Sequence, residues 1–190
     1  MASYKVSYNR TIFGNEGAYN PGIGEKETYM GVDRGANPNW PGWYVIDIYK
    51  RDNPHASVQK LNVLLGTNLN LQASIYSFYK ANYWDTVNLD NVNDQQVANN
   101  LFDCSVNQGE GMARRFIQVA CNEVIEKLNS KVSPLVIDRK IGAATLNAVN
   151  SLPAADLMNG INDLRLASYK QDSGYAEWGK VWAKRLTSYT

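Results

Sequence analysis

The chain has 190 residues, a length that suits one compact domain or two small ones sharing a core. Its formal net charge of +1 argues against a protein that grips nucleic acid electrostatically, because that function needs clustered positive charge. Hydrophobic residues make up 44% of the sequence, which is enough for a core. The 12 Tyr and 5 Trp supply rings of a kind that line sugar-binding or peptide-binding clefts and also fill cores.

Apolar residues recur at helical spacing along most of the chain. Tyr4, Tyr8 and Ile12 repeat every four residues and predict a helix over residues 3–15 that carries Glu16 at its C-terminal end. The short apolar cluster Val45–Tyr49 fits either a helix or a strand. Apolar residues at three- and four-residue steps predict further helices over 58–65, 69–84, 93–107, 112–128, 144–149, 153–168 and 178–186. No convincing alternating strand finds a partner, so the predicted fold is all-α.

Breaker and capping residues place the ends of several of these helices. Asn93-Asp94 offers an N-cap for the segment that follows it. Two glycines, Gly109 and Gly111, loosen or break the pattern after Asn107. Pro153 fits the first turn of another helix, where its missing N–H costs nothing. Trp84, Trp178 and Trp182 are expected to serve core or inter-lobe packing.

A glycine-rich turn after the first helix gathers carboxylates. Glu16 is followed by a loop with Asn20-Pro21-Gly22, which carries Glu25 and Glu27 and leads to Thr28. Apolar rings around a carboxyl disfavour its charged form, and this is how a carboxyl stays protonated as a general acid. Glycoside hydrolysis uses such an acid, usually with a second, ionised carboxylate, and Glu25 lies across the turn from Glu16. A solvated polar loop is the alternative interpretation.

Other chemistries find little support in the residues. His55 is the single histidine and lies in a polar turn, so a solvated side chain is favoured and a zinc site is improbable. Neither a P-loop nor a dinucleotide-binding glycine motif is present, and no cofactor is implied. Cys104 and Cys121 lie in helical stretches without Cys-x-x-Cys spacing, which favours free buried thiols. Trp40 and Trp43, in and beside the breaker-rich G-A-N-P-N-W-P-G, fit a cleft lining and a core equally well.

Several motifs together resemble one enzyme family. E-G-A-Y at Glu16–Tyr19 and E-T-Y-M-G-V at Glu27–Val32 resemble the opening of glycoside hydrolase family 108, the phage-type N-acetylmuramidases also described as secretion activator proteins. That opening typically reads Glu-Gly-Gly-Tyr, an aspartate-bearing loop with Gly-Gly, then Thr-x-x-Gly-Ile. Matching blocks further along the chain are Tyr83-Trp84-Asp85, L-F-D-C-S-V-N-Q-G at Leu101–Gly109, D-R-K-I-G-A-A-T-L at Asp138–Leu146, and Arg165, Tyr169, Trp182 and Arg185.

The resemblance implies a lysozyme-like helical fold with two lobes around a cleft. Residues 1–92 are expected to form the catalytic region and residues 93–190 a helical peptidoglycan-binding region, within one compact unit. Glu16 matches the family's catalytic acid, and Thr28 matches the threonine thought to help position the attacking water. The loop 20–26 is shorter than the family pattern and has neither the aspartate nor the Gly-Gly pair, so Glu25 is the candidate second carboxylate. The candidate glycan contacts are Tyr19, Trp40, Trp43 and Asn107.

The expected function is therefore peptidoglycan hydrolysis at the β-1,4 bond between N-acetylmuramic acid and N-acetylglucosamine. Residues 1–10 lack the apolar run of a signal peptide, and no apolar stretch is long enough to span a bilayer. We expect a protein made in the cytoplasm that reaches the periplasm or cell wall after release, for instance through a holin-like export partner. The alternatives are a non-catalytic peptidoglycan-binding or secretion-assisting protein without the second carboxylate, a protein-partner module, and a transglycosylase.

Overall fold

The computed structural model describes residues 1–13, 18–22 and 27–189 and divides into two compact units. Residues Tyr8–Ala81 form the first, here named the small unit, and Met1–Ser7 with Asn82–Thr190 form the second, named the large unit. The division thus falls after residue 81, whereas the sequence places the boundary after residue 92. The first helix, α1 (Tyr4–Tyr8), and a π-helical turn at Lys80–Trp84 run across the two ends of the division.

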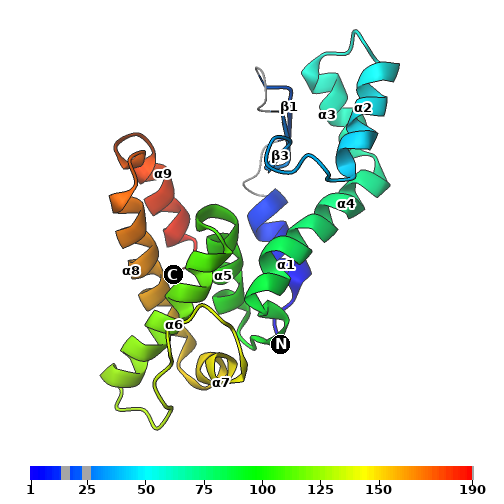
Figure 1. Ribbon diagram of the computed structural model, residues 1–190. Helices are drawn as coiled ribbons and strands as arrows, with labels where there is room; N and C mark the ends of the chain where they lie inside the picture. The colour runs from blue at the N-terminus through cyan, green and yellow to red at the C-terminus, as the bar shows by residue number, and fades with distance from the viewer. Residues whose placement is uncertain (14–17, 23–26, 190) are drawn as a thin grey trace. The chain divides into compact units, whose positions relative to one another are not determined.

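The small unit combines helices with a short sheet (Figure 1). Its elements are a π-helical turn at Asn9–Phe13, β1 (Tyr19–Asn20), β2 (Thr28–Tyr29), β3 (Val32–Asp33), α2 (Gly42–Asp52), α3 (Val58–Gly66) and α4 (Leu69–Tyr79). The ambiguous cluster at Val45–Tyr49 is helical and belongs to α2. Side-chain oxygens of Ser57 and Asn68 accept hydrogen bonds from backbone N–H groups and so begin α3 and α4.

The sheet corrects the expectation that no strands pair. The order is β1-β2-β3 and both pairs are antiparallel, with Tyr19 opposite Tyr29 and Asn20 opposite Thr28. Each strand has two residues, which is too short for an alternating pattern to stand out in the sequence. β1 and β2 therefore form a hairpin that closes the predicted catalytic loop.

The large unit is a helical bundle. It contains the 3-10 turns Asp85–Val87 and Leu89–Asn91, then α5 (Gln95–Gln108), α6 (Glu110–Lys127), α7 (Ala143–Ser151), α8 (Ala154–Gln171) and α9 (Tyr175–Thr187). α6 packs against α5 and α8, as Figure 1 shows, and α9 packs against α8. A Cβ atom on Gly160 would lie 3.1 Å from the Cβ of Ala120, so the glycine permits the close approach of α8 to α6.

The helix boundaries predicted from capping and breaker residues are confirmed. The Asp94 carboxylate accepts from the N–H groups of Gln96 and Val97 and caps α5. Gly109 has a φ of +88°, a backbone conformation that separates α5 from α6 and that favours glycine. Pro153 stands directly before α8.

A buried ionic cluster joins three helices of the large unit. Asp103 on α5 and Arg165 on α8 have fully buried side chains, and Arg165 Nη2 lies 2.5 Å from Asp103 Oδ2. Arg185 on α9 donates from Nε to Asp103 Oδ1 over 2.7 Å. Arg165 also donates to Asn100 Oδ1 over 2.6 Å and to Gln108 Oε1 over 3.1 Å. Asp103 thus has a structural role in the bundle.

The predicted burial of the tryptophan and cysteine side chains is confirmed at some positions and not at others. Trp84 is fully buried, as expected, and Trp182 stacks on Tyr169 with ring centroids 5.0 Å apart. Trp178 is 50% exposed, so the packing role expected for it is wrong: α9 turns this position towards solvent. Cys104 and Cys121 are buried free thiols, as predicted.

Among the described residues, none of the helices is both apolar enough and long enough for a bilayer crossing.

Candidate functional site

The two carboxylates predicted to do the chemistry, Glu16 and Glu25, lie in segments 14–17 and 23–26, outside the described residues. The site can be built from the residues that flank these segments. Phe13 and Ala18 border the first, and Gly22 and Glu27 border the second. All four belong to the small unit.

The hairpin fixes which side chains share a face of the sheet. Tyr19 and Tyr29 are opposite each other and both are buried, so that face packs on the core. Asn20 and Thr28 are also opposite each other and point to the other face, because side chains alternate along a strand. Asn20 is exposed and Thr28 is half-buried. Thr28 therefore lies on the accessible face of the hairpin, next to the loop that contains Glu25.

Glu27 precedes β2 and is the centre of a charged cluster that sequence patterns did not reveal. Its Oε1 accepts from the Tyr19 hydroxyl over 2.7 Å and from Lys50 Nζ over 2.8 Å. Its Oε2 accepts from Arg34 Nη1 over 2.5 Å. The three partners come from β1, α2 and the turn after β3, so the cluster arises from long-range folding and has no local spacing signal.

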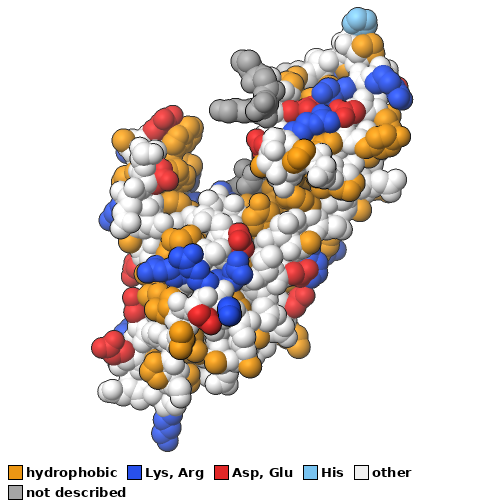
Figure 2. Space-filling view, viewed as in Figure 1, with side chains coloured by type: hydrophobic (Ala, Val, Ile, Leu, Met, Phe, Trp, Pro, Cys, Tyr) orange, Lys and Arg blue, Asp and Glu red, His pale blue; other side chains and the backbone are white. Residues whose placement is uncertain are grey.

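The charged cluster continues onto α2. The Arg34 guanidinium also forms an ion pair with Asp47 and lies 5.0 Å from the Trp43 ring centroid, within cation–π range. The Arg34 backbone N–H donates to the Glu27 carbonyl over 2.9 Å. Acidic and basic side chains adjoin one another on the surface of the small unit near α2 in Figure 2. We refer to Glu27, Arg34, Asp47 and Lys50 as the hairpin cluster.

The protonation of Glu27 follows from these contacts. Burial alone would raise the pKa of the Glu27 carboxyl, but the hydrogen bonds from Lys50, Tyr19 and Arg34 outweigh burial and lower that pKa. Burial and the bond to Glu27 raise the pKa of the Tyr19 hydroxyl, which stays a donor. An ionised, fully partnered carboxylate cannot donate a proton to a leaving group. Glu27 is thereby set aside as a general acid.

A cavity of about 200 Å³ opens beside the segment that contains Glu16. Its described lining residues are Phe13, Ala18, Tyr29, Met30, Asn62, Gly66 and Gln72. Two amides from the helices hold its walls: Asn62 Oδ1 accepts from the Tyr19 N–H over 2.6 Å, and Gln72 Nε2 donates to the Tyr29 hydroxyl over 2.8 Å. The cavity therefore combines apolar walls with fixed amide groups, and two of its lining residues, Phe13 and Ala18, border segment 14–17 in the chain.

Three of the candidate glycan contacts, Tyr19, Trp40 and Trp43, are largely buried, so little of their ring surface is accessible to a ligand. Trp43 is 2% exposed and donates from Nε1 to the Asn37 carbonyl over 2.8 Å. Trp40 is 7% exposed, stacks on Tyr29, and borders only a shallow hollow with Phe78. A Cβ atom on Gly42 would overlap the Trp40 ring, so this glycine makes room for the ring to fold inward. Tyr19, buried beside Glu27, acts as a support of the hairpin.

Asn107, the fourth predicted contact, lies at the C-terminal end of α5 in the large unit. Its side chain is exposed and donates to the Asp103 carbonyl over 2.8 Å. It borders a cavity of about 290 Å³ lined also by Gln108, Ser168, Tyr169, Asp172 and Trp182. Aromatic edges beside amide, hydroxyl and carboxylate groups are suited to a polar ligand such as a sugar.

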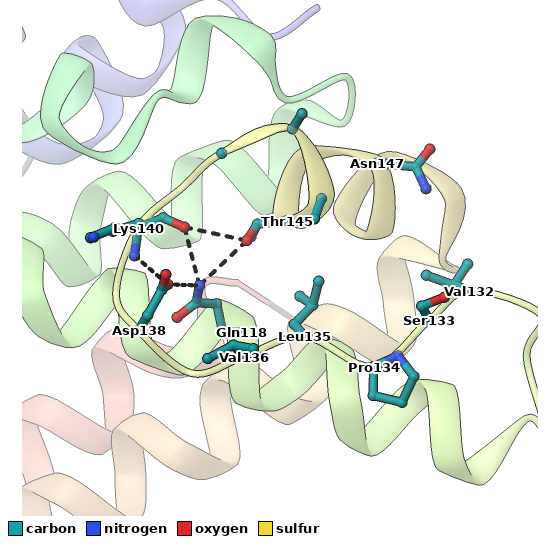
Figure 3. A pocket seen from close by; sticks show the side chains of 13 residues that line it. Gln118, Val132, Ser133, Pro134, Leu135, Val136, Asp138, Lys140, Thr145 and Asn147 are labelled. Carbon is teal, nitrogen blue, oxygen red and sulfur yellow. Dashed lines mark hydrogen bonds between the residues drawn. The ribbon is translucent and has the colours of Figure 1, made fainter.

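A larger cavity of about 600 Å³ lies between the connection that follows α6 and the first turn of α7 (Figure 3). The Gln118 amide holds this connection by donating to Asp138 Oδ1 and the Lys140 carbonyl and by accepting from the Arg139 N–H over 2.8 Å. In Figure 3 the Leu135 side chain points into the cavity, whereas the Lys140 side chain points away from it. The cavity is thus mainly apolar and carries none of the predicted site residues.

Within residues 1–13, 18–22 and 27–189, no group of three or more His, Cys, Asp or Glu side chains is placed to hold a metal ion. His55 is exposed, as predicted. The described side chains near the predicted site offer ion pairs and hydrogen-bonding groups.

Comparison with known proteins defines the class. The fold is similar to a solved structure of Brucella abortus SagA, with a TM-score of 0.63 and 21% identity over 98% of this chain and 92% of that chain. At this identity the likeness shows the fold, a mostly α-helical one of the lysozyme-like type. No curated protein matches the chain.

The family follows from a sequence profile. The profile of glycosyl hydrolase 108 matches residues 10–109, more than half of the chain, and includes the hairpin, the hairpin cluster and both loop segments. The chain belongs to the glycosyl hydrolase 108 family. This confirms the resemblance carried by Glu16–Tyr19 and Glu27–Val32, and the match ends at residue 109, so it covers only the first part of the 93–190 region expected to bind peptidoglycan.

Proposed function

We propose that the protein is a peptidoglycan hydrolase of the N-acetylmuramidase type that uses Glu16 as its general acid. Family membership over residues 10–109 is the observation that carries the proposal. Within that range, Glu16 stands in the E-G-A-Y block that matches the family's catalytic glutamate. The ionised state of Glu27, held by three hydrogen bonds, supports the choice, because it removes Glu27 from the candidates for the general acid.

The proposed chemistry transfers one proton and one glycosyl group. Glu16 donates its proton to the glycosidic oxygen as the bond from that oxygen to the anomeric carbon breaks. A water molecule, positioned by the Thr28 hydroxyl, attacks the anomeric carbon and loses a proton to an ionised carboxylate, for which Glu25 is the candidate. The accessible face of the hairpin supports this role for Thr28.

The cavity of about 200 Å³ beside Phe13 and Ala18 is the proposed place for part of a sugar ring. The Asn107 cavity in the large unit is proposed as a second glycan contact. The expected cellular route is part of the proposal: synthesis in the cytoplasm, release through an export partner, and action at the cell wall.

Mass analysis of digested murein sacculi tests this function. The unaltered protein is expected to release fragments with N-acetylmuramic acid at the new reducing end, and Glu16→Gln none. Glu25→Gln tests the second carboxylate in the same assay. Anhydromuramyl ends would show that the reaction is a transglycosylation and not a hydrolysis. New reducing ends on N-acetylglucosamine would show that the protein cleaves a different bond from the one proposed.

A protein that binds sacculi without cutting them would contradict the proposed function and support the binding or secretion-assisting alternative. The exposed Trp178 lines neither of the two proposed glycan cavities, so Trp178→Ser serves as the control for altered handling of the protein. It is expected to digest sacculi at the unaltered rate.

A further inference from the structure

We propose that Glu27 is a positioning residue for the hydrolysis reaction: its pinned carboxylate holds the β1–β2 hairpin so that Thr28 is fixed against the site. The inference rests on the proposed function and deepens it. It starts from the hydrogen bonds of Glu27, which join the hairpin to α2 at one carboxylate.

The hairpin itself supplies little rigidity. Its ladder consists of the two residue pairs Tyr19–Tyr29 and Asn20–Thr28, and β2 pairs with β3 through only two more, Thr28–Asp33 and Tyr29–Val32. A sheet of such short strands has little stability of its own in water. Position 22 is a glycine with a φ of +66°, and residues 20–22 read Asn-Pro-Gly, a turn sequence without a strand pattern. Contacts outside this small sheet therefore add to what holds the Thr28 backbone.

Glu27 contacts both strands of the hairpin and restrains them. It is the residue directly before Thr28, and its Oε1 accepts from Tyr19, the first residue of the opposite strand. The same carboxylate accepts from Arg34 and Lys50, and these cations connect it to the turn after β3 and to α2. The Glu27 side chain is only 10% exposed, so water screens its ion pairs less than it screens a pair on the surface. These ion pairs therefore restrict the hairpin more than a surface ion pair would.

The direction of the Glu27 side chain separates positioning from catalysis. Residues 27 and 29 lie on the same side of the chain, and Tyr29 faces the core, whereas Thr28 faces the accessible side. Glu27 is thus turned away from the face that carries Thr28 and acts on it through the backbone. A hydroxyl that orients a water molecule needs this constraint, since small displacements of a positioning group cost large factors in rate.

Asp47 provides a matched control. Asp47 and Glu27 both form ion pairs with Arg34, but Asp47 sits on α2, whereas Glu27 also accepts the hydrogen bond from the Tyr19 hydroxyl that joins the two strands. Asp47→Asn removes one carboxylate charge from the same guanidinium while it leaves the link between the two strands. Glu27→Gln removes the charge and weakens that link, and both changes preserve side-chain size.

Steady-state cleavage of a soluble glycan fragment provides the first test. Glu27→Gln is expected to lower kcat by roughly ten- to a hundredfold with KM within about threefold, and Asp47→Asn to leave kcat within about twofold. If Glu27 acts through Thr28, then adding Glu27→Gln to Thr28→Val lowers kcat no further. The inference is overturned if the double variant loses the product of the two single losses in kcat. It is also overturned if Asp47→Asn loses as much kcat as Glu27→Gln.

Amide hydrogen exchange provides a readout that does not need activity. Glu27→Gln is expected to speed exchange at residues 19–20 and 28–29 while α3 and α4 keep the unaltered rates, and Asp47→Asn is expected to leave the hairpin protected. Unchanged hairpin exchange in Glu27→Gln overturns the inference. An inactive unaltered protein whose hairpin loosens as expected would contradict the proposed function and leave the anchoring by Glu27 supported.

Discussion

The two ionic clusters of the molecule use the same chemical groups for different ends. In the large unit, Asp103 and Arg165 are fully buried and join helices, and every partner is part of the bundle. In the small unit, Glu27 is nearly buried, but its partners Arg34 and Lys50 are 31% and 40% exposed. The first cluster is a fixed part of a core, and the second ties a short hairpin to a helix at the predicted active site.

The difference between them is one of solvent access. A buried ion pair that loses one partner leaves an uncompensated charge in a medium of low polarity, which is costly. Water can replace part of what an exposed cation loses. We therefore expect damage to the Asp103 cluster to unfold the large unit, and damage to the hairpin cluster to alter the site while the fold persists.

The largest expected effect on stability is that of Asp103→Asn. The change leaves the buried Arg165 guanidinium without its carboxylate and should lower the free energy of unfolding by about 3–5 kcal/mol. Chemical denaturation measures it. Asp156→Asn, which breaks the exposed pair with Lys127, is the control, expected to cost at most about 1 kcal/mol. Equal losses in the two variants would remove the distinction between buried and exposed pairs.

The hairpin cluster should show an intermediate effect. Glu27→Gln is expected to lower the free energy of unfolding by about 1–2 kcal/mol, since it weakens hydrogen bonds to charged groups whose cations keep access to water. Asp47→Asn should cost no more than about 1 kcal/mol, because Asp47 is 47% exposed. A Glu27 variant as damaging as Asp103→Asn would mean that the hairpin cluster also holds the core.

The pH dependence of stability sharpens the same comparison. Contacts in the folded state lower the pKa of Glu27 from its ordinary value of 4.5. The unfolded chain therefore binds a proton more readily, so the contribution of Glu27 to stability is present above pH 4.5 and is lost as the pH falls through the lower, folded pKa. Denaturation curves at a series of pH values should show a smaller acid loss in Glu27→Gln than in the unaltered protein. If acid lowers the free energy of unfolding equally in both proteins, the lowered pKa assigned to Glu27 is wrong.

The smallest expected effect concerns the rate of thiol labelling. Burial raises the pKa of both Cys104 and Cys121 to about 12, so neither thiol should react readily at pH 8 in the folded protein. Cys104 follows Asp103 in α5, and its labelling in Asp103→Asn reports whether the bundle opens locally. Faster labelling of Cys104 with unchanged Cys121 indicates a local opening, whereas labelling of both without delay in the unaltered protein would contradict their burial.

Much of the fold could be predicted from local sequence because local interactions decide it. Helical apolar spacing, the Asp94 cap and the break at Gly109 place most helices of the large unit. The hairpin could not be predicted, since its strands have two residues each. The position of Trp40 between two prolines leaves a cleft lining and a core equally open, and the signal that the ring folds inward is Gly42, two residues later, which leaves space for it.

The candidate site could be predicted only in part. Glu16 and Thr28 follow from motifs that are contiguous in the chain. Glu27 stands in the same block, but its role depends on Tyr19, Arg34 and Lys50, which folding brings together from separate elements. The sequence alone does not show that Glu27 is ionised and held by hydrogen bonds, because the distances from a carboxyl to its charged and hydrogen-bonding partners set its pKa.

The central claim is that this glycosyl hydrolase 108 protein cleaves glycan with Glu16 as the proton donor. The most direct test is the rate at which a soluble peptidoglycan fragment gains reducing ends with the unaltered protein and with Glu16→Gln, both confirmed as folded. We predict a loss of at least about a hundredfold in kcat, the lower range for removal of a general acid. A Glu16→Gln protein that cleaves within about twofold of the unaltered rate would contradict the account.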